Sequence, residues 1–304
     1  MLNARKYILS KQISWARRNS ITLVGSKNDR GLHCYTRVID DNLFEPLLTE
    51  VKDEFNKGDG NELNSSNGYP AKVNALHSSS ALSINIFHYW KRLNKLDIIS
   101  TACGLCNSTN QSQLKLNFER KFPISKKIST APNIDVVIEN NENSQYKYYA
   151  IECKFTEAYS KRQLKSGLDD KYFSSELDGL WKKIPNLRKL ASELSDNKIE
   201  FLNFYPEQLI KHILGLLNNC DGKNFRLLYL WYDVFGEEGQ NHRKEIEKFS
   251  KYTFEDGIKF SAISYQELII KLSEYNFEGN EGYIKYITDR YLWSLKSTKR
   301  QQGV

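Results

Sequence analysis

Two carboxylates and a lysine stand on neighbouring extended segments in the middle of the chain. Asp135 lies in PNIDVVIE, and Glu152 and Lys154 lie in YYAIECKF, after the polar turn NNENSQ. Successive side chains of a strand point to opposite faces, so Glu152 and Lys154 share one face, which Asp135 reaches in a favourable register. Like charges at such range repel, and a hard divalent cation such as Mg²⁺ is the natural occupant between the carboxylates.

This set of groups suits phosphodiester cleavage. A metal held by Asp135 and Glu152 would polarise the scissile phosphate and lower the pKa of a bound water, while Lys154 would orient that water. Glu119, one predicted strand upstream in NFERKF, is a further carboxylate that could reach the ion directly or through water. We rank Glu119 below the other three, and we expect Mn²⁺ to substitute for Mg²⁺.

The string PNID, followed after a hairpin by E-C-K, resembles the motif of the PD-(D/E)XK nuclease superfamily, which has the restriction-endonuclease-like fold. In this resemblance Asp135 stands for the motif's aspartate, Glu152 for its second acidic residue and Lys154 for its lysine. The backbone carbonyl of Cys153 would complete the metal shell. The sequence departs from the motif in one respect, because two residues separate Pro132 from Asp135.

The resemblance covers about residues 78–272 and implies a biochemical function. It predicts Mg²⁺-dependent hydrolysis with DNA as the substrate, in a restriction or phage-defence setting. Two alternatives remain open. The hairpin could lie at a sheet edge with a solvated outer face, where Glu152 and Lys154 would form a minor surface pair. The chain could also be a nucleic-acid-binding module with an inactive nuclease fold, although the intact Asp135, Glu152 and Lys154 favour the enzyme.

The hydrophobic periodicity predicts an α/β fold around these residues, with a mixed central sheet flanked by helices and an N-terminal helical extension. Strands are expected where apolar residues alternate, and a buried strand in the continuous apolar run FRLLYLWYDVF. The expected strands are 114–124, 132–139, 146–155, 225–235 and 260–264. The expected helices are 41–57, 78–93, at least one within 157–198, 206–217, 243–251, 265–275 and 281–296. We expect residues 1–70 to pack as an extension on a nuclease domain of residues 71–304.

The charge composition is compatible with a polyanionic partner. The chain has 44 Lys and Arg against 37 Asp and Glu, a formal net charge of +7. Basic residues bracket the hairpin, and they could line a groove along a phosphate backbone. We select Lys126, Lys127, Lys161 and Arg162 as nucleic-acid contacts. Gln208, near the start of a predicted helix, could face the same cleft.

Other chemistries have less support. Cys103 and Cys106 form a C-x-x-C, but no second ligand pair stands at a spacing typical of zinc sites. The sequence contains neither a P-loop nor a G-x-S-x-G motif. It has no apolar run of membrane-spanning length, and its opening residues are too polar for a signal peptide, so we expect a cytoplasmic protein. The sequence leaves the oligomeric state open, with a homodimer among the options.

Overall fold

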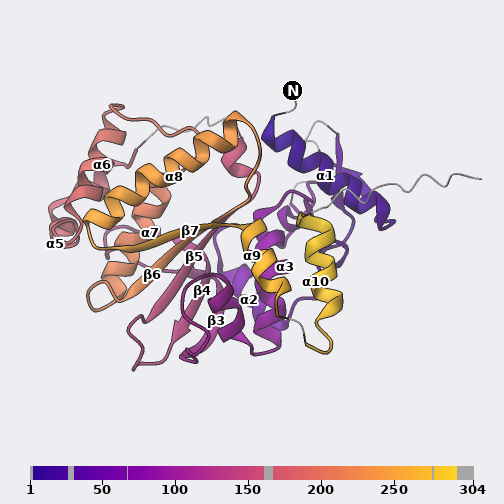
Figure 1. The fold of residues 1–304 in the computed structure, drawn as a ribbon. Helices are drawn as coiled ribbons and strands as arrows, with labels where there is room; N and C mark the ends of the chain where they lie inside the picture. Colours follow the sequence, from indigo (N-terminus) through magenta and orange to yellow (C-terminus); the bar gives the residue numbers. More distant parts are fainter. Residues whose placement is uncertain (1–2, 27–30, 67, 161–166, 276, 293–304) are drawn as a thin grey trace, which may run out of the picture.

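A five-stranded mixed sheet forms the centre of the protein (Figure 1). The computed structural model describes residues 3–26, 31–66, 68–160, 167–275 and 277–292. The strand order is β3-β4-β5-β6-β7, antiparallel from β3 to β5 and parallel from β5 to β7. The strands are β3 (Gln113–Lys121), β4 (Asn133–Asn140), β5 (Tyr148–Lys154), β6 (Phe225–Trp231) and β7 (Lys259–Ser264). All five predicted strands are therefore present, with small shifts at their ends.

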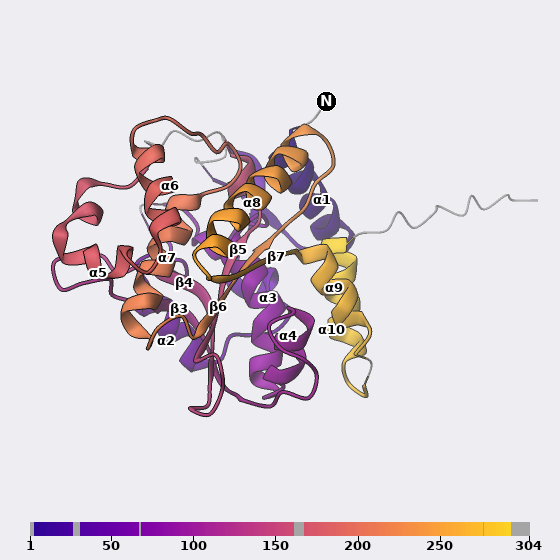
Figure 2. The ribbon, with the colours of Figure 1, turned by 60° about the vertical axis from the view of Figure 1, so that its left-hand side comes forward.

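Helices cover both faces of this sheet, as Figures 1 and 2 show from two directions. One layer holds α5 (Asp178–Trp181), α6 (Pro185–Ser195), α7 (Pro206–Asn219) and α8 (Glu237–Glu255). The other holds α3 (Ser79–Arg92), α4 (Leu96–Ala102), α9 (Tyr265–Ser273) and α10 (Glu281–Ile287). Within the described ranges, no helix combines the length and the apolar character needed to cross a membrane.

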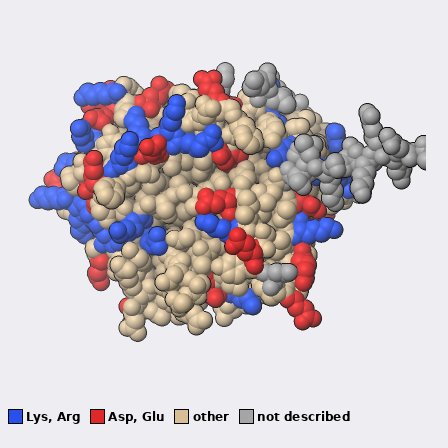
Figure 3. All heavy atoms as spheres, in the orientation of Figure 1, with Lys and Arg blue, Asp and Glu red and all other residues tan. Residues whose placement is uncertain are grey.

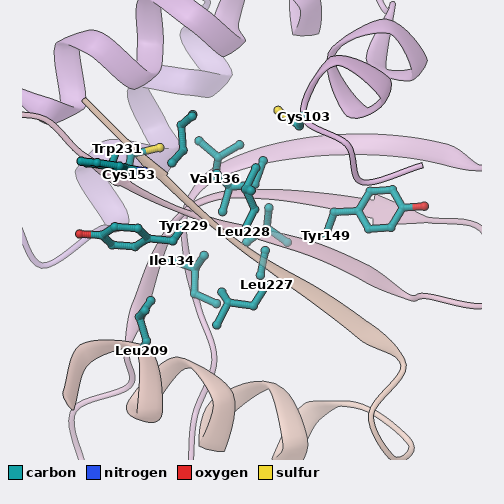
Figure 4. Close-up of a cluster of buried hydrophobic side chains, with 14 of the residues drawn as sticks. Cys103, Ile134, Val136, Tyr149, Cys153, Leu209, Leu227, Leu228, Tyr229 and Trp231 are labelled. Atoms are coloured by element: carbon teal, nitrogen blue, oxygen red, sulfur yellow. The ribbon is translucent and has the colours of Figure 1, made fainter. Parts of the chain in front are cut away.

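The core lies between the sheet and the two helical layers (Figure 4). In this view Leu209 of α7 approaches the sheet from one side and Cys103, just after α4, from the other. Leu227 and Tyr229 of β6 are fully buried between them. Since β6 has a helical layer on each face, its sequence, apolar except for Arg226 near the start, matches its environment.

The segment after β3 packs against α7 at a glycine. A Cβ at Gly215 would lie 2.5 Å from the carbonyl oxygen of Phe122, so only glycine allows this approach. Asn218 and Asn219 then donate hydrogen bonds to the carbonyl of Pro123, each at 2.9 Å. These contacts attach the segment that carries Lys126 to the α7 side of the sheet.

The N-terminal part differs from the sequence prediction in three places. It contains α1 (Ala4–Arg18), α2 (Thr49–Lys57) and a two-stranded sheet of β1 (Leu23–Gly25) and β2 (His33–Thr36), and neither a helix over 4–18 nor this small sheet was predicted. The helix expected over 41–57 was wrong in its first half, because α2 begins only at Thr49. Pro46 disfavours helical geometry at the residue before it, and Leu43 is extended. Ile8 and Val51 belong to the same buried cluster as the sheet residues.

Candidate active site

Asp135 and Glu152 lie opposite each other on adjacent strands. Val136 pairs with Ile151 in the antiparallel β4–β5 ladder, so one further step sets Asp135 against Glu152. The backbone N–H of Cys153 donates a hydrogen bond to Asp135 Oδ2 at 2.7 Å. The register therefore brings together the two carboxylates that the sequence analysis selected.

Glu152 is fully buried between two cationic or protonatable groups. Lys154 Nζ lies 2.5 Å from its Oε1, and His212 Nε2 lies 2.8 Å from its Oε2. Burial by itself would raise the pKa of Glu152, but Lys154 and His212 outweigh it and hold that pKa below the usual value. Because β5 lies between β4 and β6, the alternative of a solvated edge hairpin is wrong.

Helix α7 supplies two partners to this cluster from one face. Gln208 Oε1 accepts a hydrogen bond from Lys154 Nζ at 2.8 Å, and His212 follows four residues later on the same side of the helix. Pro206 at the first turn has a fixed φ suited to a helix start, and its missing N–H removes no helical hydrogen bond. Burial would lower the pKa of Lys154, but Glu152 and then Asp135 raise it above its usual value, so the lysine is charged.

The charge of Asp135 is compensated less than that of Glu152. In the described structure its side chain accepts one hydrogen bond, the one from Cys153. Burial, and after it the charge of Glu152, raise the pKa of Asp135 well above its usual value. A divalent cation between Asp135 and Glu152 would remove this repulsion, so the donor set fits Mg²⁺. Among the residues that the structure describes, no group of three or more His, Cys, Asp or Glu is already arranged as a metal site.

Glu119 extends the row of carboxylates to a third strand. Phe118 pairs with Val136 and Arg120 with Ile134, which sets Glu119 opposite Asp135 on β3. Its φ is +51°, a conformation that non-glycine residues rarely adopt and that is often found at functional sites. Burial first, and then the charges of Glu62 and Glu152, raise the pKa of Glu119 to about 7.

An open hollow lies next to the cluster, beyond the end of β5. It has a volume of about 420 Å³ and is lined by the start of α3 and by Thr156, Glu157 and Glu62. The charge of Glu157 acts on Lys154, and that of Glu62 acts on Glu119, which places the hollow beside the carboxylate row. A larger hollow of about 600 Å³ lies at the opposite end of β5, beside the β4–β5 turn.

Residues 10–292 match the model of a family described as "Restriction Endonuclease associating with ARP". The chain belongs to this family. Neither the curated proteins nor the solved structures gave a match. Membership of a restriction-endonuclease family confirms the predicted resemblance and the restriction-endonuclease-like α/β fold, and it indicates a nuclease of the restriction type.

The predicted nucleic-acid contacts of this family member fall into two groups. Lys126 is exposed and has no carboxylate partner in the described structure, whereas Lys127 Nζ lies 3.6 Å from Glu176. Lys161 and Arg162 lie outside the described residues. Figure 3 shows Lys and Arg gathered on the left-hand part of the visible face, where Figure 1 places α5, α6 and α8. Glu176 lies in the short 3-10 turn Ser175–Leu177 just before α5, so Lys127 borders this basic region.

His212 is the cluster residue that the sequence analysis missed. Its ring contacts Glu152 through Nε2, while its buried Nδ1 has no hydrogen-bond partner within the described part of the chain. The available signal was its spacing of four residues from Gln208, which places both side chains on one helix face.

A substitution at Glu119 tests its rank below the other acidic residues. Glu119→Gln is expected to reduce DNA cleavage by about tenfold or less, since Asp135 and Glu152 stay intact. The rate of plasmid cleavage at saturating Mg²⁺ measures this, with Glu139→Gln on β4 as the control. Complete loss of cleavage in Glu119→Gln would show that Glu119 is as necessary for cleavage as we propose Asp135 to be.

Proposed function

We propose that this protein is a Mg²⁺-dependent endonuclease that hydrolyses DNA phosphodiester bonds in the cytoplasm, as part of restriction or phage defence. The observation that carries the proposal is the contact set of Asp135, Glu152 and Lys154. The partly buried Asp135 carboxylate stands next to the fully buried Glu152 carboxylate and the charged Lys154. Membership of a restriction-endonuclease family supports DNA as the substrate.

Asp135 and Glu152 would hold the cation, with the backbone carbonyl of Cys153 as a third donor. When bound, Mg²⁺ supplies charge neutralisation at the phosphate and lowers the pKa of a coordinated water. Lys154 remains charged beside the carboxylates and can stabilise negative charge on the phosphate. Gln208 fixes the position of that ammonium group, and His212 fixes the orientation of the Glu152 carboxylate.

The proposal is tested by incubating the purified protein with plasmid DNA, phage DNA and RNA, each with Mg²⁺ and with Mn²⁺. We expect cleavage of at least one DNA substrate with either metal. Lys154→Ala should lose cleavage while it retains DNA binding. Binding without cleavage across both metals and all DNA substrates would support the other candidate, a nucleic-acid-binding module with an inactive nuclease fold. Cleavage of RNA alone would contradict the choice of substrate.

The exposed lysines after β3 are expected to contact phosphates. Each neutralised phosphate releases condensed counterions, so affinity for DNA should fall by about a hundredfold or more between low and physiological salt. Replacing Lys126 and Lys127 with Ala should weaken binding of all sequences and flatten the salt dependence, because phosphate contacts position a duplex without reading it. Fluorescence anisotropy of a labelled duplex at several salt concentrations measures both effects.

The matched control for this double variant replaces two lysines of the opposite helical layer, Lys271 on α9 and Lys285 on α10. This control should bind DNA with the wild-type affinity and salt slope. If the Lys126 and Lys127 variant kept the wild-type slope, these lysines would be solvated surface residues. The groove would then have to be sought around residues 161–165 or in the C-terminal tail, both of which lie outside the described residues.

A further inference from the structure

Phe235 is the most exposed large apolar side chain among the described residues. It is 95% exposed and lies in the connection between β6 and α8. Single exposed apolar residues are common on proteins, so exposure alone carries no conclusion. Two further features distinguish Phe235. The backbone on each side of it is held in place, and the connection starts at the end of the sheet that carries the carboxylate cluster.

The connection is firmly attached to the protein just before Phe235. Gln266 of α9 binds Asp233 twice, accepting from its N–H at 3.1 Å and donating to its carbonyl at 2.8 Å. Arg243 forms an ion pair with the Asp233 carboxylate. Phe235 therefore projects from a backbone that its neighbours hold in place.

Two glycines fix the chain on the other side of Phe235. Gly236 has a φ of +96°, which other residues rarely adopt, and directly precedes α8. A Cβ at Gly239 would lie 1.9 Å from the carbonyl oxygen of Val234, so this position also requires glycine. An aromatic side chain on such a fixed backbone loses little conformational freedom when it binds a partner.

The connection begins at the end of the sheet where the carboxylate cluster lies. Trp231 pairs with Lys154 in the parallel β5–β6 ladder, and the N–H of Tyr232 donates to the Lys154 carbonyl at 3.0 Å. Three residues span at most about 11 Å, so Phe235 lies within that distance of Tyr232. Figures 1 and 2 show the start of α8 beside the start of α1, where Ala4 N donates to Glu238 Oε2 at 2.6 Å.

We propose that Phe235 stacks on a nucleobase of the DNA held at the Asp135–Glu152–Lys154 cluster; this rests on the proposed nuclease function. An aromatic face binds any base by stacking, and apolar side chains can also enter between base pairs and open a step. A protein-docking surface would need several apolar side chains, but no second large apolar side chain of the described β6–α8 connection is exposed. A lone aromatic ring on the connection that leaves the cluster's end of the sheet fits a base.

The test compares Phe235→Ala with Phe254→Ala. Phe254 is 85% exposed and lies near the far end of α8, a helix about 28 Å long, so it is a matched control with similar exposure. Affinity for a labelled DNA duplex is measured by fluorescence anisotropy in EDTA, where no cleavage occurs. We expect Phe235→Ala to weaken binding by about tenfold, the loss typical of one stacked base, and Phe254→Ala to bind as the wild type does.

Tryptophan substitutions report stacking directly. Phe235→Trp should retain the wild-type affinity, and its added fluorescence should be quenched by DNA, whereas that of Phe254→Trp should not. Each signal is read as the difference from the wild type, which contains five tryptophans. Equal affinity of the two alanine variants, or equal fluorescence of the two tryptophan variants with DNA, would overturn the proposal and leave Phe235 for a protein partner. If the wild type bound and cleaved no DNA, the proposed function itself would fail.

Discussion

Glu152→Gln is expected to abolish DNA cleavage and to lower the free energy of unfolding by about 3 kcal/mol, because it removes the nearest counter-charge of a largely buried lysine. The charge left behind is Lys154, which is fixed beside Glu152 at 2.5 Å. Urea unfolding in EDTA measures the loss of stability, and plasmid cleavage in Mg²⁺ measures the loss of activity.

Glu139→Gln is the control for this variant. Glu139 lies on β4 and pairs with Arg120 at 2.8 Å, but both side chains are partly exposed, so this pair should contribute less than about 1 kcal/mol. Glu139→Gln should therefore cleave DNA normally and unfold at nearly the wild-type urea concentration. Equal stability losses in the two variants would contradict the buried ion pair at Glu152.

Asp135→Asn is expected to abolish cleavage and, in contrast, to stabilise the metal-free protein by on the order of 1 kcal/mol at neutral pH. Burial and the charge of Glu152 raise the pKa of Asp135 in the folded state. The folded protein then binds the proton more tightly than the unfolded chain, so wild-type stability falls as the pH rises above the unfolded carboxyl pKa of about 4. The asparagine has no such cost and can still accept the hydrogen bond from Cys153.

Urea unfolding of the wild type and of Asp135→Asn at pH 4 and pH 7.5 in EDTA measures this difference. The gain should be small at pH 4 and larger at pH 7.5. Asp59→Asn serves as the control, because that exposed carboxylate pairs with Lys121 at the surface. A loss of stability in Asp135→Asn at pH 7.5 would show that the carboxylate is well compensated without a metal.

The sequence was sufficient to predict the central hairpin and the face that carries Glu152 and Lys154. Strict alternation in YYAIECKF separates Glu152 and Lys154 from the apolar residues, and the continuous apolar run predicted β6 as a buried strand. These patterns are local and follow from the two-residue period of a strand. Gln208 could be placed near the cluster because a proline marks the start of its helix.

Features that depend on tertiary contacts were not predictable in the same way. The register that sets Asp135 against Glu152 depends on how β4 and β5 pair. The sequence is compatible with this register but does not select it over others. His212 becomes part of the cluster because α7 packs across β5. Glu119 has a positive φ inside a strand. Sequence patterns predict a positive φ mainly at glycine, so this conformation could not be predicted. The helix predicted over 41–57 rested on the spacing of apolar residues. Pro46 disfavours a helix before it, and the prediction did not account for this.

The most direct test of the account is the Mg²⁺ dependence of plasmid cleavage by the wild type and Asp135→Asn, assayed side by side at equal protein concentration. We expect the wild type to produce nicked or linear plasmid only when Mg²⁺ is present, and Asp135→Asn to produce none at any Mg²⁺ concentration. Cleavage by the wild type in EDTA, or wild-type cleavage by Asp135→Asn, would contradict the claim that Asp135 and Glu152 hold the metal that cleaves DNA.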